Sequence, residues 1–411
     1  MIEQTDSSID SPRNLNSEET LTTHNKSAWV FSGIMMFLTF GGLSVVQYST
    51  LLFEHDLNFS KAWIGTLLMC SSLMSIALPF LLQIIGKWVK NPNIILTVLL
   101  FIASISVAIL PFASNPWVAL LVYCILGLAK FGTSNMQITN ALSITKSKGH
   151  SSFLMMRSIG TLGFAVFCLV SMILSDYLKL PQMYWLFAGA YFLGGIASLF
   201  NQSVIPKQKE LVPLKTVWNW FKKGPTLTLL VLISLSNLTA FIGASFLGNF
   251  VINEMGGTHK EVSIAWSIAT FLELPFFAIC IWILKRFGLK KLILFGLVTN
   301  ALRLLLTAYS NELWSFYAAQ SLHGIFYAAT LSGFSIYLNQ RYKSDQIHHL
   351  QLFSSFIYAG FGSSIAGKLG AFIWDYSDLR FTYFSMGILA IFVSTYFLFI
   401  KLDEPEPSSS F

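Results

Sequence analysis

Glu273 is the side chain with the most evident chemical role in this sequence. It lies near the middle of an apolar stretch, Val262 to Lys285, that is long enough to cross a bilayer, since about 20 residues suffice. A carboxylate at that depth costs on the order of 3 kcal/mol or more on insertion scales, so we expect it to bind and release a proton or to pair with a cation. Pro275 follows at once and removes a backbone hydrogen bond, which predicts a kink beside the acid.

Two side chains precede Glu273 on the same helical face. Thr270 and Trp266 lie one and two turns earlier, at the spacing that places residues on one side of a helix. We predict both as substrate contacts. For Trp266 two roles remain open, because its ring would either stack on a flat substrate or pack against neighbouring helices.

A small set of ionisable side chains falls inside the predicted membrane spans. Buried charges of this kind face the bundle interior and find partners. Glu273, Arg303 and His323 are predicted to couple transport to protons, because a substrate that competes for Arg303 would free Glu273 to bind a proton. The alternatives are a structural Glu273–Arg303 ion pair and a His323 that only hydrogen-bonds its neighbours. Lys368 would line the cavity or extend to the cytoplasmic surface.

Other polar residues in the spans are predicted substrate contacts. Amide side chains offer both a donor and an acceptor to a nucleobase or ribose, although they also hydrogen-bond between helices. Arg157 lies near the cytoplasmic end of a predicted span, where it would act as an interfacial anchor. The full predicted substrate-binding set is Lys130, Gln137, Asn140, Asn237, Asn249, Trp266, Thr270, Gln320, Tyr327 and Lys368.

The composition requires a lipid environment. Of 411 residues, 54% are hydrophobic and 11% are charged, with a mean hydropathy of +0.64, whereas soluble domains carry about 25% charged residues. We therefore predict an all-α membrane protein. The net charge of +7 reflects basic cytoplasmic loops and not nucleic-acid binding. Nothing in the sequence indicates a metal or another cofactor.

The apolar runs predict twelve transmembrane helices in two six-helix halves. Residues 1–27 are a predicted disordered cytoplasmic tail, 28–200 the first half, 201–224 a cytoplasmic linker, 225–400 the second half and 401–411 a second tail. Lysine and arginine concentrate in alternate loops, which places both termini in the cytoplasm of a multi-pass inner or plasma membrane protein. The predicted spans are 28–53, 62–85, 94–113, 117–139, 153–175, 182–200, 225–252, 262–284, 292–309, 313–338, 352–373 and 381–400.

Short motifs along most of the chain resemble a known transporter family. Two six-span halves, a basic linker and short basic loops at equivalent places, G-K-W-V-K-N-P-N from Gly86 and K-R-F-G-L-K-K from Lys285, resemble the major facilitator superfamily. Two motifs, E-x-P from Glu273 and L-H-G from Leu322, are similar to motifs of phenylpropionate and lactose permeases. The motifs that resemble nucleoside–proton symporters are M-M-F-L from Met35, N-F-S-K-A-W-I-G from Asn58, T-N-A-L-S-I from Thr139, R-S-I-G-T-L-G-F from Arg157, F-V-I-N-E-M-G from Phe250 and S-L-H-G-I-F-Y from Ser321.

The sequence also departs from that family in three places. Lys90 and Asn91 stand where an aspartate is usual, the stretch from Phe40 lacks the expected tryptophans, and Ala328 replaces an acid after Tyr327. These departures bear on the substrate and on proton coupling.

The resemblance implies a secondary active transporter that works by alternating access. It also implies that Arg157 and Arg286 are gating residues, with the interfacial anchor as the alternative for Arg157. The first expectation is proton symport of a small organic solute, a nucleoside. The alternatives are a sugar or aromatic-acid permease, which the cations Lys130, Arg303 and Lys368 favour, and a transporter-like sensor that does not transport. No motif of a metalloprotease, an α/β-hydrolase or a P-loop enzyme occurs, so we predict no enzyme. The expected partners are substrate, protons and the lipid bilayer, and we expect a monomer.

Overall fold

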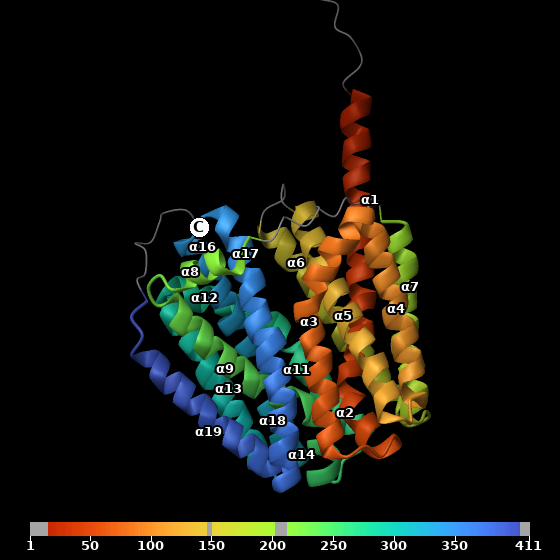
Figure 1. Ribbon diagram of the computed structural model, residues 1–411, viewed down its shortest axis with the longest axis vertical. Helices are drawn as coiled ribbons and strands as arrows, with labels where there is room; N and C mark the ends of the chain where they lie inside the picture. The colour runs from red at the N-terminus through yellow and green to blue at the C-terminus, as the bar shows by residue number, and fades with distance from the viewer. Residues whose placement is uncertain (1–14, 90, 146–149, 202–211, 403–411) are drawn as a thin grey trace, which may run out of the picture.

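Two bundles of helices lie side by side in the computed structural model, which describes residues 15–89, 91–145, 150–201 and 212–402 (Figure 1). The first bundle, red to yellow in the figure, holds the N-terminal half and the second, green to blue, holds the C-terminal half. The N-terminal half consists of α1 (Leu15–Leu43), η1 (Ser44–Tyr48), α2 (Ser49–Leu51), η2 (Leu52–Asp56), α3 (Lys61–Trp88), α4 (Pro92–Ile109), η3 (Leu110–Phe112), α5 (Pro116–Thr145), α6 (His150–Leu174) and α7 (Leu180–Leu199).

The C-terminal half contains more interruptions. Several of its membrane-crossing stretches include short π-helical turns, which are frequent at functional sites. The short α8 (Leu214–Phe221) precedes this half, which consists of α9 (Thr226–Ser245), α10 (Leu247–Asn249), η4 (Phe250–Glu254), α11 (His259–Phe271), α12 (Glu273–Phe287), α13 (Leu289–Ala308), α14 (Leu313–Gln320), α15 (His323–Phe326), η5 (Tyr327–Leu331), α16 (Ser332–Arg341), α17 (Ser344–Ser355), η6 (Phe356–Gly362), α18 (Ser363–Tyr376) and α19 (Leu379–Leu398).

The helix boundaries differ from the predictions mainly at the tail and the linker. Helix α1 begins at Leu15, inside the segment predicted as a disordered tail, and α8 lies inside the predicted linker. Residues 1–14, 202–211 and 403–411, which carry the remainder of the predicted tails and linker, lie outside the described residues.

Nine of the described helices are long and apolar enough to cross a membrane, and ten if the bent pair in residues 259–287 counts as one span. Twelve were predicted from the sequence. The other two predicted spans are also helical: one is α7 and the other is the stretch 313–341. Neither is both long enough and apolar enough to count as a membrane-crossing helix. The second of these is divided into four short segments, because its helix changes hydrogen-bond pattern at Tyr327–Leu331.

The helix is interrupted beside Glu273, as predicted: α11 ends at Phe271 and Glu273 is the first residue of α12. A bend of 44° follows a turn later, between the stretches His259–Phe276 and Ile279–Phe287. Pro275 explains the interruption, because it has no N–H to donate to the carbonyl of Phe271 and its ring clashes with that carbonyl.

The two halves are joined firmly at one end of the bundle. We call the end where α1 begins the terminal end, at the top of Figure 1, and the opposite end the distal end. At the distal end Glu54 of η2 accepts hydrogen bonds from the Nδ2 atoms of Asn249 (2.5 Å) and Asn253 (3.0 Å) in the other half. Other hydrogen bonds across the same boundary join Tyr48 with Ser263, Thr50 with the carbonyl of Ser245, and Lys260 with Asp176.

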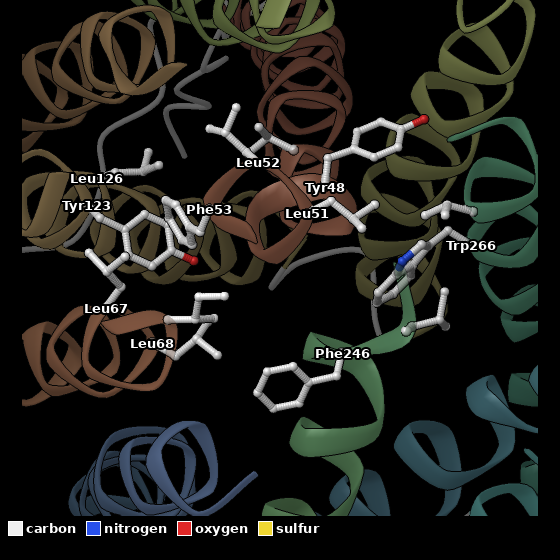
Figure 2. Packing of buried hydrophobic residues seen from close by; sticks show 14 of the residues in the cluster. Tyr48, Leu51, Leu52, Phe53, Leu67, Leu68, Tyr123, Leu126, Phe246 and Trp266 are labelled. Atoms are coloured by element: carbon white, nitrogen blue, oxygen red, sulfur yellow. The ribbon is translucent and has the colours of Figure 1, made fainter. Parts of the chain in front are cut away.

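One hydrophobic cluster extends across both halves. Figure 2 shows Phe53 beside Tyr123 on one side, with ring centroids 5.0 Å apart, and Phe246 and Trp266 from the C-terminal half on the other. Because the cluster includes side chains from both bundles, apolar packing as well as hydrogen bonding connects the halves.

Helix α6 approaches α1 most closely at Gly163. A Cβ atom at this position would lie 2.1 Å from the carbonyl oxygen of Phe37, which is a backbone atom and has little freedom to move. By contrast, a Cβ atom at Gly189 of α7 would meet nothing within 4 Å. Only the first glycine is therefore required by packing.

We expect Gly163→Ala to lower the thermal unfolding midpoint of the purified protein in detergent, because overpacking costs about 1–3 kcal/mol. Gly189→Ala is the matched control. It should leave the midpoint unchanged or raise it slightly, since alanine favours helix by up to ~1 kcal/mol over glycine. Equal midpoints for both variants would contradict the close approach of α1 and α6.

Candidate functional site

Arg303 of α13 is the centre of a buried polar group in the C-terminal half. Only 1% of its surface is exposed. Its Nη1 atom lies 3.2 Å from Oε1 of Gln320, to which it donates, and 2.9 Å from Nδ1 of His323. Gln320 in turn donates to the hydroxyl of Thr307 at 2.9 Å. The structure thus joins Arg303, Gln320 and His323, three of the predicted site residues, in one network.

An aromatic row leads from this network toward the other half. The ring of Trp266 lies 5.6 Å from that of His323, and His323 lies 5.0 Å from Tyr327. Phe164 of α6 extends the row across the boundary, 5.7 Å from Trp266. The indole Nε1 of Trp266 is buried and has no acceptor among the described residues. Its N–H is therefore available to a ligand, since a buried indole usually finds a partner.

Glu273 interacts with a different partner from the one considered from the sequence. It is the first residue of α12 and is partly exposed. The charge that acts on its carboxylate is Arg157 of α6, in the opposite half. Among the described residues no acidic side chain forms an ion pair with Arg303, so the predicted Glu273–Arg303 pair is absent there. Arg157, predicted as a gate or an anchor, also interacts with Tyr358 of η6.

The glycine of the L-H-G motif permits close contact with Glu273. A Cβ atom on Gly324 would lie 2.6 Å from Cα of Glu273, a backbone atom at the break between α11 and α12. The short helix α15 therefore packs directly on the acid-bearing segment, and its first residue, His323, is held near Glu273. The motif thus has a steric role in addition to supplying the histidine.

The predicted residues of α5 contact other neighbours. Gln137 donates to Thr39 and Asn140 donates to Ser32 at 3.1 Å, so both amides connect α5 to α1. Lys130 is half-buried, with its ammonium 5.6 Å from the ring of Tyr123. These contacts stabilise helix packing. For the two amides, this is the alternative role of hydrogen bonding between helices.

Four other predicted residues also lie away from the Arg303 network. Asn237 donates to the carbonyl of Tyr358 at 3.0 Å, and Asn249 donates to Glu54 at the distal end. Arg286 is exposed at the terminal end of α12, beside Phe287, and Lys368 extends to α3. Thr270, by contrast, lies one turn from Trp266 as predicted and donates to its carbonyl at 2.7 Å.

One polar residue near the interface between the halves was not selected from the sequence. Gln47 lies in η1 and is only 2% exposed, and the Cys168 thiol is the side-chain partner of its amide. A long amide in an otherwise apolar stretch, F-G-G-L-S-V-V-Q, was the available signal. Its backbone carbonyl lies close to Gly248 of the other half, so Gln47 is a further candidate contact.

The comparisons with known proteins agree with this geometry. Residues 29–385 match the model of the MFS_1 like family. The chain therefore belongs to this family of major facilitator transporters: it is a secondary transporter and a multi-pass membrane protein, not an enzyme.

Individual relatives are distant. The chain is 19% identical over 366 residues to the uncharacterized transporter YwbF of Bacillus subtilis (strain 168), covering 87% of this chain and 90% of that protein. A point mutant of the nucleoside transporter NupG is similar in structure, with a TM-score of 0.80, 18% identity and coverage of 90% of this chain and 99% of that one. A bacterial homolog of the human lysosomal transporter Spinster, described as inward-facing, has a TM-score of 0.65, 13% identity and coverage of 91% and 96%. These similarities establish the major facilitator fold.

We expect Arg303→Lys to destabilise the protein by about 1–3 kcal/mol, because the shorter side chain does not bring its ammonium to the position of Nη1, which contacts both Gln320 and His323, and a buried partner is left unsatisfied. Thermal unfolding in detergent measures this. Arg286→Lys, the same change at an exposed site, is the control and should have little effect. Similar decreases of the unfolding midpoint in both variants would show that the contacts of Arg303 Nη1 with Gln320 and His323 add no stability.

Proposed function

We propose that this transporter couples uptake of a nucleoside to the movement of protons. The observation that carries the proposal is the position of Glu273, a partly exposed carboxylate at a helix break, on which the charge of Arg157 in the opposite half acts. The strength of that interaction would change when the halves move relative to each other. The carboxylate would then bind a proton in the state that removes it from Arg157, because burial disfavours an unpaired charge.

The movement itself follows from the architecture. In transporters of this kind the halves rock about a site near the midplane, which opens to each side of the membrane in turn. The hydrogen bonds from Asn249 and Asn253 to Glu54 close the distal end in the present conformation.

We propose that both termini are cytoplasmic, as the distribution of lysine and arginine predicts, that the protein resides in the inner or plasma membrane, and that it acts as a monomer.

The aromatic row supports a flat substrate. Trp266, His323 and Tyr327 present rings on which a nucleobase can stack, and the Trp266 N–H lacks a partner among the described residues. The amides of Gln47 and Gln320 lie on either side of the boundary between the halves. A structural neighbour described as a nucleoside transporter adds to this argument.

One observation favours a second substrate class, an aromatic or sugar acid. Arg303 is buried and has no acidic partner among the described residues. A buried cation without an anion is costly, and a carboxylate substrate would provide the missing charge. Binding without transport, as in a transporter-like sensor, would be detected as affinity without uptake.

We expect cells that lack nucleoside transport to accumulate labelled uridine or adenosine when they express this protein, and to lose that accumulation with a protonophore. One proton moving through 100 mV contributes about 2.3 kcal/mol, enough for roughly 40-fold accumulation. Glu273→Gln should reduce accumulation to simple equilibration, because the side chain can no longer exchange a proton.

The control for that experiment is Glu312→Gln, which neutralises an exposed carboxylate at the distal end and should accumulate normally. Uptake that is unchanged by the protonophore and by Glu273→Gln would indicate a facilitator. An absence of nucleoside uptake by protein shown to be at the membrane would reject the nucleoside, and uptake of an aromatic acid would then support the second class.

We expect Trp266→Phe to raise the KM for the nucleoside about fivefold while stacking is retained, because the variant loses one hydrogen bond of about 1 kcal/mol. Trp314→Phe, at a residue that is 73% exposed, is the matched control and should not change KM. An unchanged KM in Trp266→Phe would exclude the indole N–H from substrate binding.

A further inference from the structure

An apolar groove runs along the outer face of the bundle, between α3 of the N-terminal half and α18 of the C-terminal half. Its volume is about 560 Å³, within the range of sites that hold small ligands. Met69 and Leu73 line it from α3, and Phe361, Ile365 and Phe372 line it from α18. The last three are each at least 50% exposed, so the groove opens sideways and not into the polar interior.

The side chain of Lys368 also lines this groove, and its ammonium lies beside it, on the first turns of α3. Its ammonium donates to the carbonyl of Ala62 at 3.1 Å and to the hydroxyl of Thr66 at 2.9 Å. An ammonium has three N–H donors, so one remains for a further acceptor. Among the described residues no acidic side chain is paired with Lys368. A charge on a lipid-facing surface is costly and normally finds a partner.

The ammonium lies near the distal end of α3. Ala62 and Thr66 belong to the first turns of α3, at the distal end of the bundle. Nearby, the rings of Trp63 and Trp117 lie 4.9 Å apart, and Trp117 is 68% exposed. Exposed aromatic residues at span ends mark the membrane–water interface. Lys368 lies within the groove, because Phe372, one turn nearer the distal end of α18, also lines it.

A second lysine lies on the same helix pair. The ammonium of Lys61 donates to the carbonyl of Trp374 at 3.1 Å and lies 5.0 Å from its ring. Two cations and an apolar channel thus occur together at the distal end of α3 and α18. A phosphate group with an attached acyl chain matches both features, because the lysines attract the phosphate and the channel accepts the chain.

We propose that this groove is a binding site for an anionic phospholipid, with the phosphate at Lys368 and one acyl chain along Met69, Leu73, Phe361 and Ile365. The site is distinct from the Arg303 network and does not depend on the identity of the transported substrate. Because its walls belong to different halves, a bound lipid will favour the conformation in which α3 and α18 are in contact.

The close contact of these helices supports that coupling. A Cβ atom on Gly367 would lie 2.6 Å from Cβ of Leu68, and one on Gly65 would lie 2.7 Å from Cβ of Ala371. The interior side of the interface is thus fully packed, whereas its lipid side is hollow. A relative movement of the halves changes the width of the groove and hence its affinity for a chain.

Native mass spectrometry of the full-length protein tests the site, with phosphatidylglycerol and phosphatidylcholine of identical acyl chains as probes. We expect phosphatidylglycerol to bind more tightly, and Lys368→Gln to weaken its binding about fivefold, as for one basic side chain at an anionic lipid surface. Lys179→Gln, at an exposed lysine of the distal end away from the groove, should not alter binding.

A second measurement does not depend on a variant. Phosphatidylglycerol with a photoreactive acyl chain should label α3 near Met69–Leu73 and α18 near Phe361–Phe372 in the unaltered protein. Equal binding of the two lipids, equal binding by Lys368→Gln, displacement by free oleate or by detergent at comparable concentration, or labelling confined to other helices would each overturn the proposal.

Discussion

The electrostatic interaction between Glu273 and Arg157 is the constraint on which the site depends. Both side chains are half-buried, and they belong to different halves of the molecule. A cation near a carboxylate favours its charged form. In the mechanism that we propose, a change in the relative position of the halves alters the protonation of Glu273, and a change in its protonation alters the relative stability of the conformations.

Close packing of the backbone sets this geometry. The acid opens α12 because Pro275 interrupts the helix, and α15 approaches the interruption because Gly324 has no side chain. That approach holds His323 between the Arg303 network and the indole of Trp266. A proline, a glycine and a histidine, each unremarkable alone, thus arrange one aromatic and one charged surface around the same point.

The predictions succeeded where local chemistry determines the outcome. The interruption beside Glu273 and the proximity of Thr270 to Trp266 depend on the backbone properties of proline and on helical spacing. The network of Arg303, Gln320 and His323 was not predicted, because it joins different helices. Asn237, Asn249, Gln137 and Asn140 stay predictions as substrate contacts, and each amide donates to a partner on another helix. An isolated sequence does not distinguish these two uses of an amide.

The sequence by itself determined the class of the protein, since 54% hydrophobic residues in runs of helix length are stable only in lipid. It also determined which side chains must be compensated inside the membrane. Only the tertiary structure decided their partners: Arg157 and not Arg303 acts on Glu273, and Lys368 extends to α3 at the distal end. The reason is physical, because helical periodicity fixes the face on which a residue lies, whereas the crossing of helices from separate halves fixes what that face meets.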